Sequence, residues 1–389
     1  TQGSLYVNSE AGLYGSLTFD WTGSGDSPKL IILNHIAFNA GSSINVTQEN
    51  AGLIYLGGDV FFNAGSNLNM TGGFLQFAGI GNSHIRTSAP TTIHHLVSSK
   101  EPGYDTLFLG YNDACLTIGG NLEVYAGSTL GTFYSEGYTT IPDICLKGNL
   151  SVDPGGTCAL DHGTLSLEGV ANSSFNLGDA GNYVHDLRIY KTGTFNYTVT
   201  LHSDIDVRGD LVIDDGILET RVMAYPSNFY YDLLVGGDWD NNAGTGAFKE
   251  YSSMSVTLNG TGEQILSTET FSNLILDKPG GNMFIPAGSN VICTSYDWVH
   301  GAYQVDGGTF SANDLADNGI WGDITLFSGT INYHQDTNAG STVDLQGDLT
   351  IVGGVFNVFG GAGDSWWTGS LTMVGGTLDF CDVGIYIPY

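Results

Sequence analysis

Two aspartates stand in a short charged run that could do acid–base chemistry. Asp204 and Asp206 are two residues apart, and Arg208 follows them. Residues two apart in a β-strand point to the same face, so the carboxylates would lie side by side, one donating and one accepting a proton. A polysaccharide hydrolase or lyase is therefore the alternative function. Alternating acids on a solvated strand are commonplace, however, and we expect no catalytic residues.

The tripeptide Arg208-Gly209-Asp210 resembles a cell-attachment sequence, but it also fits a recurring structural pattern. A glycine followed by Asp or Asn and then an apolar residue occurs at several other points of the chain. These points are Gly120-Asn121, Gly148-Asn149, Gly237-Asp238 and Gly322-Asp323. Because Gly, Asn and Asp adopt the conformations of tight turns, we expect this tripeptide to form an ordinary corner of the fold.

The sequence predicts no cofactor and no multi-ligand metal site. His94 and His185 occupy the same position of an internal repeat, but about 90 residues separate them, which is too far for one ion. Gly360–Asp364 resembles a calcium-binding nonapeptide, yet it occurs once and Ser365 stands where that motif has an aspartate. Isolated calcium ions at acidic turns stay open as an alternative.

The five cysteines show neither the CxxC spacing of zinc and redox sites nor nearby clusters of histidines. We expect buried thiols. Cys145 and Cys158 form the one pair that we would test for a disulfide. Cys115 and Cys293 stand in equivalent repeat positions several turns apart, beyond the reach of a disulfide.

The net charge of −30 comes from 40 acidic and 10 basic residues, and no Lys or Arg follows Lys278. Such a surface repels nucleic acid and anionic lipid, and no apolar run is long enough to span a membrane. We expect neither nucleic acid nor membrane insertion. A groove for an acidic polysaccharide needs a base and would lie in residues 1–278. The first residue is Thr1, from which we expect an exported protein, extracellular or at the cell surface.

Six Asn-x-Ser/Thr sequons are candidate glycosylation sites, a number that the composition would produce by chance. They are Asn45, Asn69, Asn149, Asn172, Asn196 and Asn259. Aromatic residues could stack on sugars, so carbohydrate is a candidate partner. Trp366-Trp367 is the first choice for an exposed contact, because adjacent strand residues face opposite ways.

The stretch Val256–Gly281 recurs twice upstream in altered form and shows how the chain is built. Three long units follow one another, with starts marked by Gly79, Gly169 and Gly260, and each carries a lysine at the same position, Lys100, Lys191 and Lys278. The repeat is therefore about 90 residues long. The recurrence of a scarce base at one position has no evident catalytic purpose.

Short alternating strands separated by Gly, Asn and Asp turns predict an all-β, single-chain parallel β-helix (β-solenoid), with right-handed crossovers. The turns at Asn39 and Asn63 are 24 residues apart, which fits one coil. Each long unit would hold four coils of about 22 residues or three of about 30. We favour four, which gives about 16–18 coils in all.

We expect one continuous β-solenoid over residues 1–389. It comprises N-terminal coils in 1–73, three repeats in 74–321 and C-terminal coils of about 22–25 residues in 322–389. A β-propeller would need sub-repeats of about 40–50 residues, which are not seen. An array of immunoglobulin-like domains would fit a step of 90 residues, but the Cys…Trp…Cys pattern is missing.

The strings VTLNGTGEQILSTETFSNLILDKPGG, RGDLVIDDGILET and VGGDWDNNAGTGAF resemble the repeats of large secreted bacterial surface proteins that form right-handed parallel β-helices. The likeness covers about residues 75–376 and rests on the general pattern of the repeats. It implies an adhesin-like, display or structural role and transfers no functional residue.

Solenoid ends expose an apolar rung and unpaired strand edges, which proteins normally cover. Here strand-like residues extend almost to both termini, so we expect end-to-end self-association. The expected assembly contacts are Leu5, Tyr6, Val7, Trp366, Trp367, Phe380, Ile385, Tyr386 and Ile387. The sequence thus predicts a non-enzymatic extracellular structural protein, either a β-helical surface filament subunit or an adhesin stalk. A polysaccharide-binding or polysaccharide-degrading β-helix protein with a lateral groove is the alternative.

Overall fold

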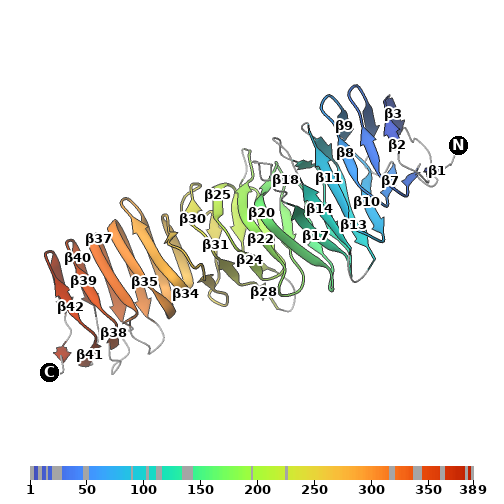
Figure 1. The fold of residues 1–389 in the computed structure, drawn as a ribbon. Coiled ribbons are helices and arrows are strands. Elements are labelled where there is room, and N and C mark those ends of the chain that lie inside the picture. Colours follow the sequence, from blue (N-terminus) through green and yellow to red (C-terminus); the bar gives the residue numbers. More distant parts are fainter. Residues whose placement is uncertain are drawn as a thin grey trace. The chain divides into compact units, whose positions relative to one another are not determined.

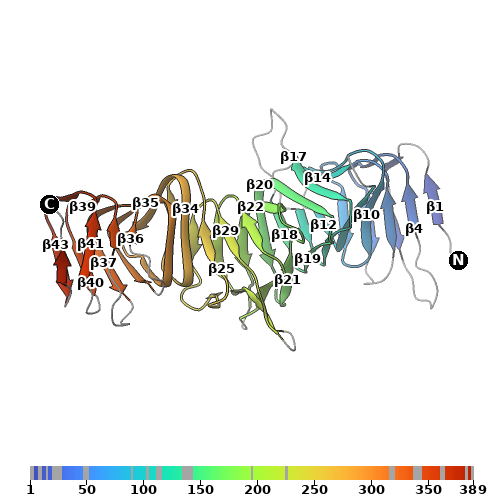
Figure 2. The ribbon, with the colours of Figure 1, turned by 90° about the horizontal axis from the view of Figure 1, so that it is seen from below.

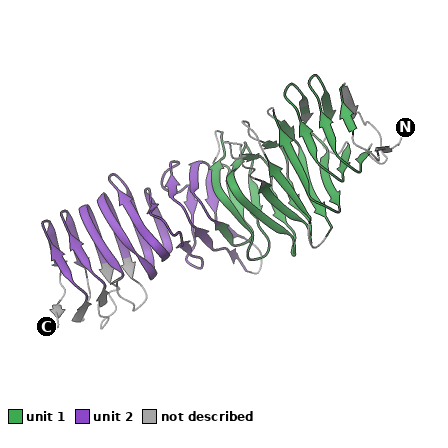
Figure 3. Ribbon diagram, in the orientation of Figure 1, with its two compact units in different colours: residues 1–206 green, residues 207–389 purple. Residues whose placement is uncertain are grey.

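In the residues that the computed structural model describes, the chain folds into stacked parallel strands and has no helix (Figure 1). The structure describes residues 4–7, 11–14, 16–19, 29–46, 52–88, 91–101, 105–110, 116–133, 143–193, 196–223, 227–314, 320–335, 344–359, 364–381 and 384–386. The predicted all-β parallel solenoid is confirmed. The chain divides into two compact units, residues 1–206 and residues 207–389 (Figure 3).

Each turn of unit 1 has three sides, and every side is a ladder of parallel strands (Figure 2). The first side holds β1 (Ser4–Val7), β4 (Lys29–Ile32), β7 (Leu53–Leu56), β10 (Phe74–Gly79), β13 (His95–Lys100), β16 (Leu122–Val124), β19 (Leu150–Val152), β21 (Ser173–Asn176) and β23 (Thr198–Leu201). The second side holds β2 (Ala11–Leu13), β5 (Ile36–Phe38), β8 (Val60–Phe62), β11 (Ser83–Thr87), β14 (Thr106–Gly110) and β17 (Thr129–Phe133). The third holds β3 (Ser16–Phe19), β6 (Ser43–Val46), β9 (Asn67–Met70), β12 (Thr91–Ile93), β15 (Leu116–Ile118) and β18 (Ile144–Leu146). The longer strands β20 (Thr157–Glu168) and β22 (Tyr183–Tyr190) bend from the second side to the third.

Unit 2 repeats this parallel stacking, with β24 (Ile205–Val207) at the boundary. Its strands are β25 (Leu211–Asp215), β26 (Ile217–Glu219), β29 (Leu233–Val235), β30 (Trp239–Asn241), β31 (Phe248–Lys249), β32 (Val256–Leu258), β33 (Gln264–Ile265), β34 (Glu269–Pro286), β35 (Asn290–Asp314), β37 (Asp323–Gln335), β39 (Leu349–Ile351), β40 (Val355–Phe359), β42 (Leu371–Met373) and β43 (Thr377–Cys381). A separate ladder holds β36 (Ile320–Trp321), β38 (Asp344–Gln346), β41 (Asp364–Thr368) and β44 (Gly384–Tyr386). One antiparallel hairpin, β27 (Arg221–Val222) with β28 (Phe229–Tyr230), projects from the stack.

Strand residues alternate between an apolar core and the outer surface. In β6, for example, Ile44 and Val46 are fully buried while Ser43 and Asn45 are half-buried. The inward positions of successive turns stack on one another, Ile44 on Leu68 in the next turn. Each rung therefore buries its apolar face only against its neighbours, which is why a single turn could not be stable alone.

Several turns of unit 1 are longer than expected, whereas in unit 2 the steps from Val256 to Leu274 and from Leu349 to Leu371 are 18 and 22 residues. About 13 turns are present, fewer than the 16–18 predicted. The reason is that the register pairs Ser4 with Lys29, Leu96 with Leu122, and Leu122 with Leu150, steps well above the 22 residues that we favoured. The 24-residue spacing of the two Asn-Ala-Gly-Ser turns is one turn of the solenoid, as predicted, because Ser43 pairs with Asn67.

The 90-residue repeat does not hold a whole number of turns. From Gly79 at the end of β10, the chain makes three full turns, through β13 and β16 to β19. It then crosses two more sides in β20 before it reaches Gly169. Equivalent residues of these two copies therefore lie on different sides of unit 1, and neither three nor four coils per unit is correct.

Candidate functional site

Polar side chains at the corners join each turn to the next. In unit 1, Nδ1 of His95 accepts the backbone N–H of Asn121 at 2.9 Å. Oδ1 of Asn121 then accepts the N–H of Asn149 at 3.1 Å, and Oδ1 of Asn149 accepts that of Ser174 at 2.8 Å. We call such a series a corner ladder. It satisfies backbone donors that the sharp turn would otherwise leave unpaired.

The same device explains the Arg-Gly-Asp tripeptide in unit 2. Oδ1 of Asp210 accepts the N–H of Asp238 at 2.8 Å, and Oδ1 of Asp238 accepts that of Ile265 at 2.7 Å. The predicted corner is confirmed. Burial raises the pKa of Asp238 and the neighbouring acids add to the rise, although its hydrogen bond from Ile265 opposes it.

Corner glycines are required because the turns approach closely. A Cβ on Gly236 would lie 2.3 Å from the carbonyl oxygen of Arg208, and one on Gly260 would lie 1.8 Å from that of Gly236. These separations are far below any non-bonded contact between carbon and oxygen. Glycines of the Gly-Asp/Asn pattern are equally confined, since a Cβ on Gly148 would lie 2.4 Å from the carbonyl oxygen of Gly120 and one on Gly237 would lie 2.2 Å from Oδ1 of Asp210. The pattern thus combines a glycine that permits the close approach with an acceptor that bonds the next turn.

The three recurring lysines are buried and hold backbone carbonyls. Nζ of Lys191 donates to the carbonyl oxygen of Glu168 at 2.6 Å. Nζ of Lys278 donates to the carbonyl oxygen of Gly260 at 3.0 Å and to Oε1 of Gln264 at 2.5 Å. Burial lowers the pKa of both Lys191 and Lys278 to about 8. The recurring lysine therefore donates a hydrogen bond to a backbone carbonyl oxygen at the corner one turn earlier in the chain.

The paired carboxylates of the sequence lie on an open strand surface. Asp204 is exposed, Asp206 is half-buried and Ile205 between them is buried, so the two acids share the outer face as predicted.

Two other acids have unusual environments that the sequence did not reveal. Burial raises the pKa of Glu250 to about 8 and also raises that of Glu269, which is 2% exposed. Glu250 accepts the N–H groups of Ser272 and Asn273, and Oε2 of Glu269 accepts Nδ2 of Asn241 at 2.7 Å. These acids hold neighbouring turns together, and Glu269 is inaccessible to a polymer substrate. Their hydrogen-bond partners depend on which residues of neighbouring turns are paired, and the sequence does not show that pairing.

The cysteines correct one prediction. Cys145 is in a disulfide, whereas Cys158 is a buried free thiol, so the pair that we favoured is wrong. In the register, Cys158 stacks on Leu130 at a core position while Cys145 stacks on Thr117 at an outer one. Burial raises the pKa of Cys158 to about 12, which makes it a poor nucleophile. Cys293 is likewise a buried free thiol; Cys115 lies outside the described residues.

His94 and His185, the two histidines at equivalent repeat positions, contact different neighbours. The ring of His94 packs edge-on against His95, with centroids 4.2 Å apart. Nδ1 of His185 lies 2.9 Å from Oδ1 of the adjacent Asp186. Within the described ranges, no three His, Cys, Asp or Glu side chains gather as a metal site would require.

The candidate glycosylation and assembly residues are spread over both units. Asn172 and Asn196 are exposed, and Asn45, Asn149 and Asn259 are half-buried. The Oδ1 atoms of Asn149 and Asn172 accept N–H groups from the next turn, so both side chains take part in the bonding between turns. Among the assembly residues, Phe380 is half-buried. The side chains of Asn69, Leu5, Tyr6, Val7, Trp366, Trp367, Ile385 and Tyr386, and all of Ile387, lie outside the described part.

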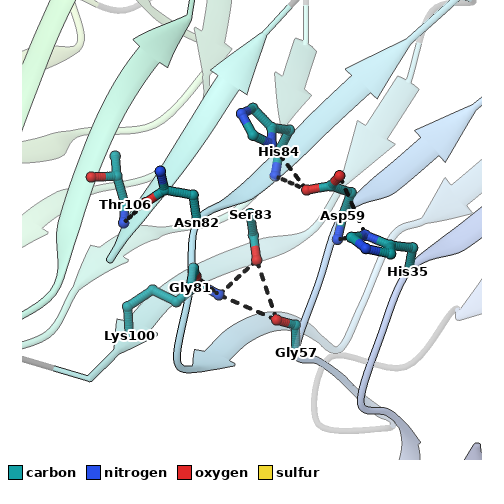
Figure 4. Close-up of polar contacts among 9 residues, drawn as sticks. All are labelled: His35, Gly57, Asp59, Gly81, Asn82, Ser83, His84, Lys100 and Thr106. Carbon is teal, nitrogen blue, oxygen red and sulfur yellow. Dashed lines mark hydrogen bonds and ion pairs between the residues drawn. The ribbon is translucent and has the colours of Figure 1, made fainter. Parts of the chain in front are cut away.

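One hollow on the outer face of unit 1 brings polar and aromatic groups together. A pocket of about 280 Å³ is lined by Ala11, His35, Ile36, Ala37, Asp59 and Phe61. Nδ1 of His35 accepts the N–H of Asp59 at 2.8 Å, and Oδ1 of Asp59 accepts both the N–H and Nδ1–H of His84, each at 2.9 Å (Figure 4). Burial pushes the pKa of Asp59 upward, but the hydrogen bonds from His84 outweigh it and the pKa lies below the usual value.

A serine and a lysine beside this hollow resemble a nucleophilic dyad but face the interior. Nζ of Lys100 lies 2.6 Å from Oγ of Ser83 and 2.9 Å from the carbonyl oxygen of Gly81 (Figure 4). Ser83 is 0% and Lys100 2% exposed. Since adjacent strand residues face opposite ways, Ser83 points inward and His84 outward. The dyad therefore cannot attack a substrate in the hollow.

No protein-family model, no curated protein and no solved structure matches the chain. A search of the described residues found no helix that is long and apolar enough to cross a membrane.

Proposed function

We propose that this chain is a non-enzymatic extracellular structural protein, the subunit of a β-helical surface filament or the stalk of an adhesin. The observation that carries the proposal is the use of its recurring polar residues. Corner Asn and Asp residues bond the next turn, and the repeat lysines hold corner carbonyls. Residues that looked chemically active therefore serve the stacking of turns.

Self-association is proposed to use the last described turn of unit 2. Leu371 and Met373 of β42 are 43% and 46% exposed. The residues that pair with them in β39, Leu349 and Ile351, are 3% and 0% exposed. Among the described strands, β42 pairs with β39 alone, and its apolar side chains are more exposed than their partners in β39. Such a strand favours addition of another strand, here the first turn of a second copy.

Sedimentation velocity over a concentration series tests this assembly. The double variant Leu371→Glu with Met373→Glu places charges at the edge and should shift the protein to monomer. Thr372→Glu adds a charge to the same strand at an outward position and serves as the matched control. Equal association by wild type and the double variant would contradict assembly through β42.

The enzymatic alternative is tested separately. Purified protein is incubated with polygalacturonate, alginate and neutral β-glucans, and new reducing ends or unsaturated products are measured. We expect no turnover. Product formation that disappears in Asp204→Asn with Asp206→Asn would establish the hydrolase or lyase instead.

A further inference from the structure

The hollow on the second side of unit 1 arises from the sizes of its outward residues. Gly12, Ala37, Phe61 and Arg86 occupy one outward column in successive strands β2, β5, β8 and β11. The small residue Ala37 therefore stands beside the large ring of Phe61, while the ring of Tyr14 lies over Gly12, with its Cε2 3.1 Å from the position of an added Cβ. The guanidinium carbon of Arg86 lies 5.3 Å from the centroid of the Phe61 ring, which supports the ring from the side away from Ala37.

The polar groups at the hollow form a donor and an acceptor of fixed identity. Because Nδ1 of His35 accepts the N–H of Asp59, the proton of the neutral imidazole is on Nε2, which can donate. In that tautomer the 3.3 Å approach of Nδ1 to Oδ2 of Asp59 is no ion pair. Oδ1 of Asp59 is occupied by His84. Oδ2 has no donor among the described residues and can accept.

We propose that this hollow binds one neutral pyranose residue of a glycan. The apolar face of a sugar ring would lie against Phe61, as aromatic faces favour. Neighbouring hydroxyl groups would donate to Oδ2 of Asp59 and accept from Nε2–H of His35. The volume of about 280 Å³ lies below the roughly 300–1,000 Å³ of pockets that enclose a whole small ligand, which suits a single ring of a longer chain.

Charge selects a neutral glycan over an acidic one. The protein carries a net charge of −30, and the carboxylate of Asp59 lines the hollow itself. Both repel a polyanion. The inference goes beyond the structural role proposed above, since a scaffold can display a sugar site whether or not it forms filaments.

Saturation-transfer-difference NMR and calorimetry with four oligosaccharides test the site. The neutral probes are cellohexaose, mannohexaose and xylohexaose, and a hyaluronan hexasaccharide is the acidic comparison. Phe61→Ala removes the platform, and Ala37→Leu fills the hollow from an outward position without touching the core. Phe108→Ala is the matched control, because Phe108 is an outward ring that stacks on His84 and does not line the hollow.

We expect at least one neutral probe to bind, Phe61→Ala and Ala37→Leu each to weaken binding at least tenfold, and Phe108→Ala to change it less than twofold. Circular dichroism confirms that each variant is folded, and Ala37→Leu carries the test should Phe61→Ala unfold. Failure of all neutral probes, preferential binding of hyaluronan, or unchanged binding in both hollow variants would each overturn the proposal. Filament assembly is measured separately, so its failure is distinguishable.

Discussion

Replacing Gly260 by alanine tests the close approach of turns at a corner. The added Cβ would lie 1.8 Å from the carbonyl oxygen of Gly236. A normal contact between carbon and oxygen is about 3.3 Å or more, so the two turns must separate by more than about 1 Å where strands stack about 4.8 Å apart. Overpacking of this kind costs about 1–3 kcal/mol.

Hydrogen bonds at the same corner increase the expected loss. Lys278 donates to the carbonyl oxygen of Gly260, and the N–H of Gly260 donates to Gln264, both at 3.0 Å. Loss of each contributes about 0.5–1.5 kcal/mol. We therefore expect Gly260→Ala to lower the free energy of unfolding by about 2–6 kcal/mol in total.

Gly262→Ala is the matched control, because a Cβ there meets no atom within 4 Å. This change should be neutral or stabilise by up to about 1 kcal/mol through the unfolded state. Urea unfolding followed by circular dichroism measures both variants, and hydrogen exchange localises the effect to β32–β34. A loss in Gly260→Ala within about 1 kcal/mol of that in Gly262→Ala would refute the reasoning, since the control sets the baseline.

Three further predictions concern titrating groups. Lys191 and Lys278 have folded pKa values of about 8, below the unfolded value of about 10.4. Between these two values the unfolded state binds more protons than the folded state. The contribution of the two lysines to stability therefore rises with pH across that window. Urea midpoints from pH 7 to 10 should therefore rise more steeply in wild type than in Lys191→Met with Lys278→Met; equal slopes would contradict the assignment. Glu250 has a folded pKa of about 8, above the unfolded value of about 4.3, so its contribution to stability is present below about pH 4 and is lost as pH rises to about 8. Urea midpoints measured from about pH 4 to 8 should show this decline in wild type and lack it in Glu250→Gln; an equal decline in both proteins would contradict the assignment. Cys158 and Cys293 should resist maleimide in the native protein and react after denaturation, as peptide mapping can determine, and rapid native labelling would show that they are not buried.

Much of the fold could be predicted because its signals are local. The 24-residue spacing from Asn39 to Asn63 corresponds to one turn, and each Gly-Asp/Asn pair marks a corner. These residues carry conformational requirements that hold at any point in a chain. The alternating apolar residues then fix which side of each strand faces the core.

Other features depend on the register between turns, which the sequence does not display. The repeat spacing from Gly79 to Gly169 suggested a whole number of coils, but long and short turns together displace the second copy to another side. The cysteine prediction failed because the two side chains face different ways. Cys145 occupies an outer strand position whereas Cys158 faces the core.

The hollow likewise depends on the register between turns. Ala37 and Phe61 are unremarkable in sequence, and only their alignment in one outward column creates space beside the ring. Lys278 had no explanation as an isolated residue. Its contact with Gly260 appears once the register is known, because Gly260 and Lys278 are 18 positions apart, the same step as between the paired residues Leu258 and Leu276.

Imaging of the purified protein tests the structural role most directly. Negative-stain micrographs would be recorded across a concentration series, for wild type and for Leu371→Glu with Met373→Glu. A filament subunit should form fibres one molecule wide that lengthen with concentration, and the double variant should remain as single particles. Single particles of wild type at every concentration would contradict assembly through the exposed edge of β42.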